Sequence, residues 1–249
     1  LPLQAYAGNL PGSLEEALGQ LLVNGTFYHL WYFPAVITGC LLMALALPRL
    51  ELRKTGVLAL LLFLIGLLGD SWFGLAQRLP ALDAFYQGIF TVSTYTRNGL
   101  FYTPAFLFLG VLAARRRPVS WRLGLALSLC LLLPEGWLTY SLGWQRHNSM
   151  YLALLPASWF LFAALLSVRG RDLRALRPVS MGIYLLHPLV IVLVRGGARV
   201  LGLWSLLVKN TFLHWLAVCL ASLALAAALA CLQKLWKGRK YGSKEPRLD

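Results

Sequence analysis

Residues 211–232 read TFLHWLAVCLASLALAAALACL and contain no Asp, Glu, Lys or Arg. A bilayer core about 30 Å thick needs about 20 mostly apolar residues in a helix, because each backbone N–H and C=O must be satisfied without water. This stretch therefore has the length and composition of a membrane-spanning helix. The whole chain has the same character, since 59% of its 249 residues are hydrophobic and only 13% are charged. The predicted fold class is an all-α, polytopic integral membrane bundle.

Other stretches along the chain have a similar length and apolar character. They lie at residues 28–47, 55–76, 94–114, 119–140, 150–168 and 178–195. With residues 211–232 they predict about seven transmembrane helices in one domain, residues 1–232. Residues 233–249 are predicted to form a basic cytoplasmic tail or linker. Because the chain starts at Leu1 without a signal-peptide pattern, we expect it to be a piece of a longer protein whose first helices are missing.

The distribution of Lys and Arg predicts the orientation, because basic residues are retained in cytoplasmic loops. Seventeen of the 23 basic residues lie in four segments, and the other six lie in the segments between them. The four basic segments are 48–54, 114–122, 169–178 and the tail 233–249. The start of the chain is thus predicted to be extracytoplasmic and the tail cytoplasmic, in a multi-pass protein of the bacterial cell membrane whose partner is the lipid bilayer.

The same features exclude other functions. The net charge of +14 comes from short basic runs between apolar stretches, which does not fit a nucleic-acid surface. The four cysteines lie in apolar stretches without CxxC spacing, so no disulfide framework is expected. The four histidines lack HxxxH or HExxH spacing, so no metal site is expected.

Polar residues collect at the predicted outer ends of the spans. An ionisable group in a span costs several kcal/mol unless it is paired or faces water, so Asp70 and Arg97 are functional candidates. We expect Asp70, Arg97, His147 and His187 to surround one outward cavity. The full set of predicted substrate-binding residues is His29, Asp70, Arg97, Asn98, His147, Ser149, Tyr184 and His187.

Prolines support an outward polar pocket, because proline inside a helix leaves the carbonyl four residues earlier without its donor. Such a broken backbone survives at membrane depth only when it is buried in protein or lines a watery cavity. The prolines expected to act in this way are Pro34, Pro104, Pro156 and Pro188.

The roles of these residues remain open between alternatives. Asp70 either contributes to a ligand site or forms a structural ion pair with Arg97 or Arg146. His187 shares a helix face with Tyr184, and it either handles a proton or holds a neighbouring helix through one hydrogen bond. For His214 a structural hydrogen bond is the favoured interpretation.

Several short runs resemble a known family. Ser-x-x-Ile-Tyr-Leu-Leu-His-Pro at residues 180–188 resembles a late-helix motif of the acyltransferase-3 family, integral membrane proteins of about ten helices. Four further runs resemble the membrane domain of the membrane-bound serine/alanine racemases of vancomycin-resistant bacteria, and this resemblance extends over about residues 18–232. These runs lie at residues 21–35, 69–74, 96–99 and 149–152.

The resemblance implies two activities, acyl transfer and racemisation. For each of them, we expect part of the required machinery to lie outside this chain. In the acyltransferase-3 family the catalytic histidine and an arginine lie on the first helices, upstream of Leu1, so the catalytic residues stay unknown here. The resemblance to that family implies acyl-CoA as the acyl donor. In the racemases a cytoplasmic domain with pyridoxal phosphate follows the membrane domain, which is thought to supply L-serine. No cofactor is therefore expected in this chain, and a fused racemase domain is the expected partner.

Three functions compete on this basis. The first is acyl transfer to a small acceptor in the outer pocket, with an imidazole as general base. The second is binding and uptake of a small amino acid such as L-serine, with Asp70 holding the ammonium and Arg97 the carboxylate. The third is a plain membrane anchor for a cytoplasmic domain, which leaves the one-sided polar cluster unexplained.

Overall fold

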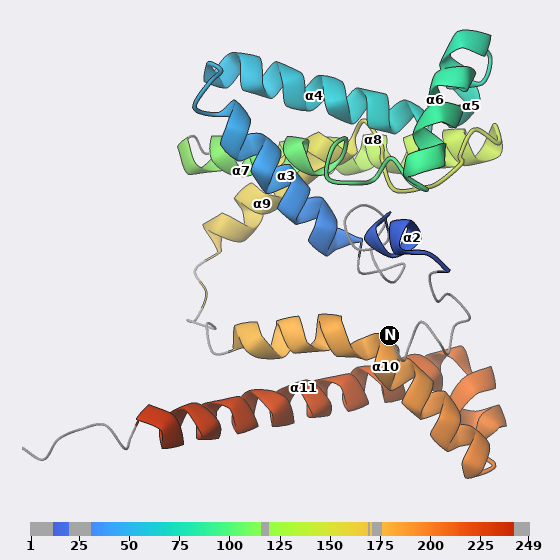
Figure 1. Ribbon diagram of the computed structural model, residues 1–249, viewed down its shortest axis with the longest axis vertical. Helices are drawn as coiled ribbons and strands as arrows, with labels where there is room; N and C mark the ends of the chain where they lie inside the picture. Colours follow the sequence, from blue (N-terminus) through green and yellow to red (C-terminus); the bar gives the residue numbers. More distant parts are fainter. Residues whose placement is uncertain (1–11, 20–30, 116–119, 169, 171–175, 242–249) are drawn as a thin grey trace, which may run out of the picture. The chain divides into compact units, whose positions relative to one another are not determined.

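The computed structural model describes residues 12–19, 31–115, 120–168, 170 and 176–241 (Figure 1). The described residues form helices joined by turns and loops, with no β-strand among them. The chain divides into two compact units, residues 1–169 and residues 170–249. The predicted all-α class is thus confirmed for the part of the chain that the structure describes.

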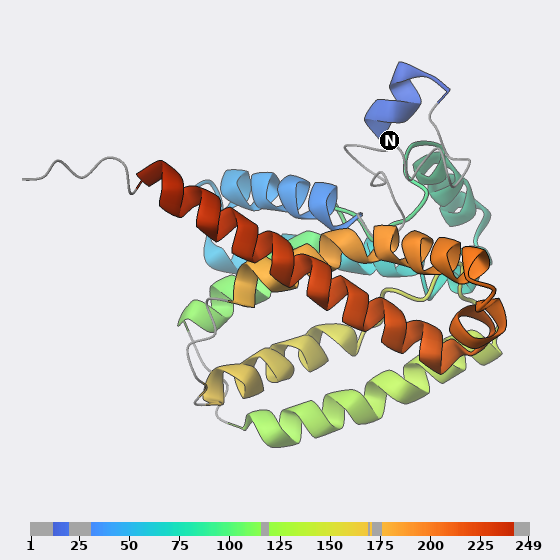
Figure 2. The same cartoon turned by 90° about the horizontal axis from the view of Figure 1, so that it is seen from below.

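The first unit is built around α7. Its longer helices are α3 (Tyr32–Ala46), α4 (Leu52–Leu68), α7 (Thr103–Arg115), α8 (Trp121–Ser141) and α9 (Leu154–Ser167). The described part of the unit also contains α2 (Leu14–Gly19), α5 (Phe73–Ala76) and α6 (Pro80–Val92). Helix α7 packs against α3, α4 and α9, and α8 lies alongside α9 (Figure 2). The loop between α8 and α9 and the segment between α6 and α7 carry four of the eight predicted site residues.

Met150 ties the α8–α9 loop into the core of this unit. Its side chain is fully buried in a cluster with Phe63, Leu67 and Ala105. Gly66 makes this approach possible, because a Cβ atom there would lie 2.7 Å from Met150 Cε. The loop is therefore anchored between α4 and α7 by an apolar side chain.

The second unit is a helical hairpin with a short turn. It contains α10 (Arg177–Val200), the π-helical turn η3 (Ser205–Lys209) and α11 (Thr211–Tyr241). Helix α10 packs along α11, where a Cβ atom at Gly182 would lie 3.0 Å from Ala226 Cβ. Figure 1 shows α10 bending part-way along its length, as expected of a helix with the interior proline Pro188. His214 on α11 makes the expected structural hydrogen bond, with Nδ1 2.9 Å from the Leu207 carbonyl oxygen.

Every predicted span contains a helix, but the helices are often shorter than predicted. Within the described ranges, three helices can cross a membrane by length and composition: α8, α10 and the Thr211–Trp236 part of α11. Helices α3, α7 and α9 are apolar but have only 15, 13 and 14 residues. The helix in the predicted span 55–76 ends at Leu68, because Gly69 and Asp70 form a turn. The first nine residues of the predicted span 94–114 are not helical.

The prediction that a proline inside a helix frees a backbone carbonyl was wrong for three of the four prolines. Pro34, Pro104 and Pro156 lie in the first turns of α3, α7 and α9. The backbone N–H groups of a first turn have no partner inside their helix, so proline there frees no carbonyl. Pro188 does lie inside α10, and so does Pro134 inside α8, which the sequence interpretation overlooked.

Candidate functional site

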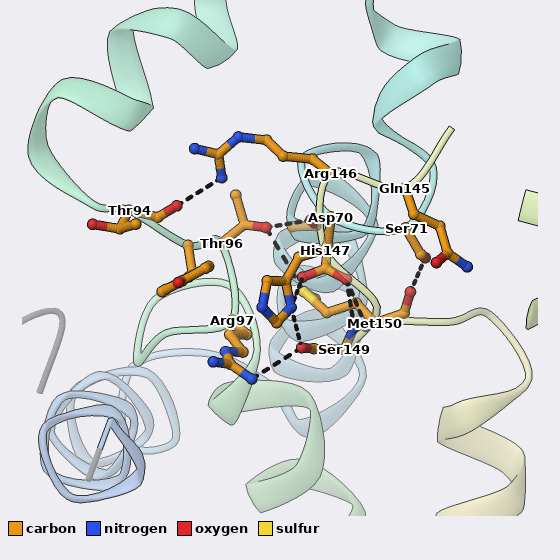
Figure 3. A network of polar contacts seen from close by, with 12 residues as sticks. Asp70, Ser71, Thr94, Thr96, Arg97, Gln145, Arg146, His147, Ser149 and Met150 are labelled. Carbon is orange, nitrogen blue, oxygen red and sulfur yellow. Dashed lines mark hydrogen bonds and ion pairs between the residues drawn. The ribbon is translucent and has the colours of Figure 1, made fainter. Parts of the chain in front are cut away.

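Three chain segments bring polar side chains together in the first unit (Figure 3). They are the turn after α4 (residues 69–72), the segment between α6 and α7 (93–102) and the loop between α8 and α9 (143–153). We call the last of these the site loop. Asp70, Arg97, His147 and Ser149 meet here and form the polar cluster. Sequence reasoning had selected all four residues.

Asp70 holds the site loop through the loop's own backbone. Its Oδ1 accepts hydrogen bonds from the N–H groups of Ser149 at 2.7 Å and Met150 at 2.9 Å. Its backbone carbonyl accepts another from the Arg146 N–H at 3.1 Å. The residue is 0% exposed, and its Oδ2 lies 3.8 Å from His147 Nδ1. A carboxylate that receives several N–H donors is stabilised in place, so Asp70 fixes the shape of the loop.

Arg97 brings a positive charge to the same place. Its guanidinium lies 5.1 Å from the ring centre of Trp31 and 4.8 Å from that of Tyr95. One nitrogen, Nη1, donates to Ser149 Oγ over 3.2 Å. The residue is only 8% exposed. Aromatic faces on a desolvated guanidinium hold it by cation–π attraction and leave its plane oriented.

Ser149 links the two charged residues, because its N–H bonds to Asp70 and its hydroxyl to Arg97. The same hydroxyl lies 2.7 Å from His147 Nδ1, and the His147 ring packs edge-on against Tyr95 with centroids 4.7 Å apart. Burial, together with the charges of Arg97 and Arg146, lowers the pKa of His147 below its usual 6.5. The imidazole is therefore neutral near pH 7.

His147 should make the fold sensitive to acid. The unfolded chain takes up a proton near pH 6.5, whereas the folded state resists it, so the free energy of unfolding should decrease as the pH falls below about 6.5. We expect the thermal midpoint of the detergent-solubilised protein to fall between pH 7 and pH 5, and to fall less in His147→Gln. Parallel curves for the two proteins would show that His147 does not contribute.

Asn98 lies in the segment beside the cluster and organises that segment. Its Oδ1 accepts from the N–H groups of Leu100 and Phe101, both at 3.0 Å, and its Nδ2 donates to Ser93 Oγ and to the Tyr95 carbonyl oxygen. These bonds form a turn stabilised by an Asn side chain, which places the neighbouring Arg97.

Three predicted residues are not on the segments of the polar cluster. His29 lies outside the described residues. Tyr184 and His187 are on α10 in the second unit, so their grouping with Asp70 stays a prediction. His187 Nδ1 lies 2.9 Å from the Tyr184 carbonyl oxygen, the group that Pro188 leaves without a donor. The carbonyl can only accept, so Nδ1 is the donor in this contact.

Sequence reasoning missed Glu135 and Gln145. Glu135 lies inside α8, yet its Oε1 accepts from Leu152 N at 2.6 Å and its Oε2 from Ala153 N at 2.9 Å. Gln145 Nε2 donates to Thr139 Oγ1 at 2.8 Å and to Tyr151 Oη at 3.2 Å. The available signal was a carboxylate in the middle of an otherwise apolar span, which needs a reason to be there.

The cluster does not have the geometry of a Ser-His-Asp relay. In such a relay the carboxylate and the serine contact different ring nitrogens of the histidine. Here Asp70 and Ser149 both face Nδ1 of His147. The cluster is therefore not arranged to activate Ser149 as a nucleophile through His147. Among the described side chains, no group of three or more His, Cys, Asp or Glu is arranged to hold a metal ion.

Comparison with known proteins identifies the class. Residues 3–231 match the acyltransferase domain that defines the acyltransferase-3 family. The chain belongs to this family. Its apolar helices agree with a membrane protein of that class.

The curated relatives are racemases. A serine/alanine racemase of Enterococcus gallinarum is 39% identical over 93% of this chain and 33% of its own length. Two amino-acid racemases of Enterococcus faecalis are 34% and 36% identical over 96% and 86% of this chain. The chain spans about a third of the length of these relatives. No solved structure matches it.

Proposed function

We propose that this chain is the membrane domain of an amino-acid racemase and that its polar cluster binds a small amino acid, with L-serine as the first candidate. The names of the curated relatives support the substrate class. In this proposal racemisation takes place in a separate cytoplasmic domain. Pyridoxal phosphate needs a lysine to hold it, and the lysines with described side chains, Lys54, Lys209 and Lys234, are all exposed. They do not fit that cofactor, so no step is assigned to it here.

The observation that carries the proposal is the position of Arg97. The guanidinium of an arginine that is 8% exposed, near two aromatic rings and beside a serine hydroxyl, is suited to bind a carboxylate with two parallel hydrogen bonds. An amino acid supplies such a carboxylate. The neutral imidazole of His147 and the hydroxyl of Ser149 lie beside it and offer hydrogen bonds to the polar remainder of the ligand.

Asp70 receives a different role from the one that the sequence indicated. The sequence hypothesis made it the partner of the ligand's ammonium group. Its Oδ1 is already occupied by two backbone N–H groups and the residue is 0% exposed. We therefore assign Asp70 to positioning Ser149 and His147 rather than to direct contact with the ligand.

The proposal includes seven spans with the cluster on the extracytoplasmic side of the bacterial cell membrane. The basic loops support this orientation. They contain 17 of the 23 Lys and Arg residues, and the polar cluster lies on segments from the other set of loops.

Reporter fusions test the orientation. Alkaline phosphatase folds to an active enzyme only outside the cytoplasm, so a fusion after Arg174 should be inactive and a fusion after Arg146 should be active. The second fusion is the control for expression of the first. Activity after Arg174, without activity after Arg146, would reverse the orientation and place the cluster inside the cell.

Acyl transfer is the second candidate, because the family is one of acyltransferases. His187 gives it a structural basis: the Nδ1–H bond to the Tyr184 carbonyl orients the ring, and in a ring bonded in this way Nε2 is the nitrogen that would act as a general base. The acceptor would be the hydroxyl or amine of the bound small molecule, and the donor an acyl thioester such as acyl-CoA.

One experiment separates the two candidates. Cells or vesicles containing the protein are supplied with labelled L-serine, and serine uptake is measured beside acetyl transfer to serine. The binding and uptake proposal predicts unmodified serine inside the vesicles. Acetylated serine without uptake would support acyl transfer, and neither result above the level of empty vesicles would refute both.

A further inference from the structure

The site loop is held by two carboxylates from opposite sides. Asp70 receives the N–H groups of Ser149 and Met150, and Glu135 receives those of Leu152 and Ala153. Asp70 lies in the turn after α4, whereas Glu135 lies inside α8. Four backbone donors within five residues are thus satisfied by side chains from distant parts of the sequence.

Glu135 holds the backbone just before α9, a helix without a side-chain cap of its own. The first N–H groups of a helix lack intrahelical partners, and a side chain at the preceding position normally accepts one of them. Helix α9 begins at Leu154 after Ala153, which has no side-chain acceptor. The carboxylate of Glu135 accepts instead from the N–H groups of Ala153, the N-cap residue, and of Leu152 before it, and its negative charge suits the positive end of the α9 dipole.

A third donor fixes Glu135 itself. Trp72 Nε1 donates to Glu135 Oε1 over 2.8 Å, and Trp72 belongs to the turn that carries Asp70. The two carboxylates are therefore connected, and the residues between their attachment points on the loop cannot shift without breaking charge-assisted hydrogen bonds. These bonds also explain how a carboxylate is tolerated in an apolar helix.

We infer that Glu135 is a positioning residue for the amino-acid site: by holding Leu152 and Ala153 it keeps Ser149 and His147 beside Arg97. The expected effect of Glu135 on amino-acid binding rests on the proposed function, whereas its expected effect on the site loop does not. A site that is preorganised in this way binds without first ordering its own loop.

Glu135→Gln is the direct test, because it preserves length and volume and replaces one oxygen by an amide nitrogen. In glutamine only the amide oxygen accepts, and it can accept from two donors. One of the three donors, Trp72 Nε1 or the N–H of Leu152 or Ala153, will therefore face the amide nitrogen, which cannot accept. We expect amide hydrogen exchange at Leu152 and Ala153 to become about tenfold faster and the affinity for L-serine to fall about tenfold. Each tenfold change corresponds to roughly 1.4 kcal/mol. Glu51→Gln, at an exposed ion pair with Lys54, is the matched control and should change neither.

A further readout separates positioning from a general loss of stability. If the loop loosens in Glu135→Gln, His147 becomes more hydrated, and its pKa measured by NMR should rise toward 6.5 in the still-folded protein. Loss of a nearby negative charge alone would move it the other way. An unchanged His147 titration together with unchanged exchange at Leu152 and Ala153 would overturn the inference.

The two proposals can be rejected separately. Wild-type protein that protects these amides but binds no L-serine would refute the proposed function and leave the loop clamp standing. Should Glu135→Gln not fold, Trp72→Phe replaces it: loss of the donor that fixes Glu135 should speed amide exchange at Leu152 and Ala153 relative to the wild type, in which both amides should be protected. Rapid exchange at both amides in the folded wild type would contradict the inference.

Discussion

Replacement of Asp70 by Ala should lower the free energy of unfolding by roughly 2 to 6 kcal/mol. The change removes the acceptor of two backbone N–H groups, and each buried donor left unsatisfied costs about 1 to 3 kcal/mol. No water can replace the carboxylate without rearrangement, since the residue is 0% exposed. Thermal or denaturant unfolding of the purified protein in detergent measures the change.

Asp83→Ala is the matched control. Asp83 lies in the first turn of α6 and accepts an exposed hydrogen bond from Gln87 Nε2 at 3.3 Å. Loss of such a surface carboxylate near a helix N-terminus costs less than about 1 kcal/mol. Equal destabilisation by Asp70→Ala and Asp83→Ala would show that Asp70 does not hold the site loop.

Combining Asp70→Asn with Arg97→Gln tests the alternative of a structural ion pair. If the two charges chiefly neutralise each other, each single variant leaves a buried charge uncompensated, and the double variant recovers much of the lost stability. We expect no such recovery, because Asp70 accepts from the Ser149 N–H whereas Arg97 donates to the Ser149 hydroxyl. The two variants therefore remove separate hydrogen bonds, and their losses of stability should add.

Arg97→Gln should weaken L-serine binding by at least about 30-fold, which corresponds to about 2 kcal/mol. Glutamine keeps a hydrogen-bond donor but has neither the charge nor the two parallel N–H groups that a carboxylate accepts. Arg78→Gln is the control, because Arg78 also stacks on a tryptophan, at 5.2 Å from the Trp144 ring centre, but is exposed. Its affinity for L-serine should stay within twofold of wild type.

The fold class could be predicted from the sequence because apolar length alone decides it. The helix ends could not, since they depend on tertiary contacts. The helix in the span predicted at 55–76 stops at Leu68, where Asp70 turns away to bond the backbone of a loop 79 residues further along the chain. The hydropathy of the sequence gives no information about such a contact. The same limit explains why Pro34, Pro104 and Pro156 were placed inside helices rather than at their beginnings.

The candidate site was partly predictable for a related reason. Asp70, Arg97, His147 and Ser149 are conspicuous because polar groups near apolar spans are costly, and the structure brings them together. Glu135 follows the same rule but was overlooked among the leucines of its span. Its partners are backbone N–H groups, which have no signature in the sequence. The proposed division of labour, in which Asp70 holds the loop and Arg97 binds the ligand, required atomic distances.

The most direct test of the account compares L-serine with L-serinamide, in which the carboxylate is replaced by a neutral amide. Equilibrium binding of both compounds is measured with wild-type protein and Arg97→Gln in lipid nanodiscs. The account predicts saturable binding of L-serine to the wild type, much weaker binding of L-serinamide, and loss of this discrimination in Arg97→Gln. Equal binding of the two compounds to the wild type, or no saturable binding of L-serine at all, would contradict a carboxylate site at Arg97.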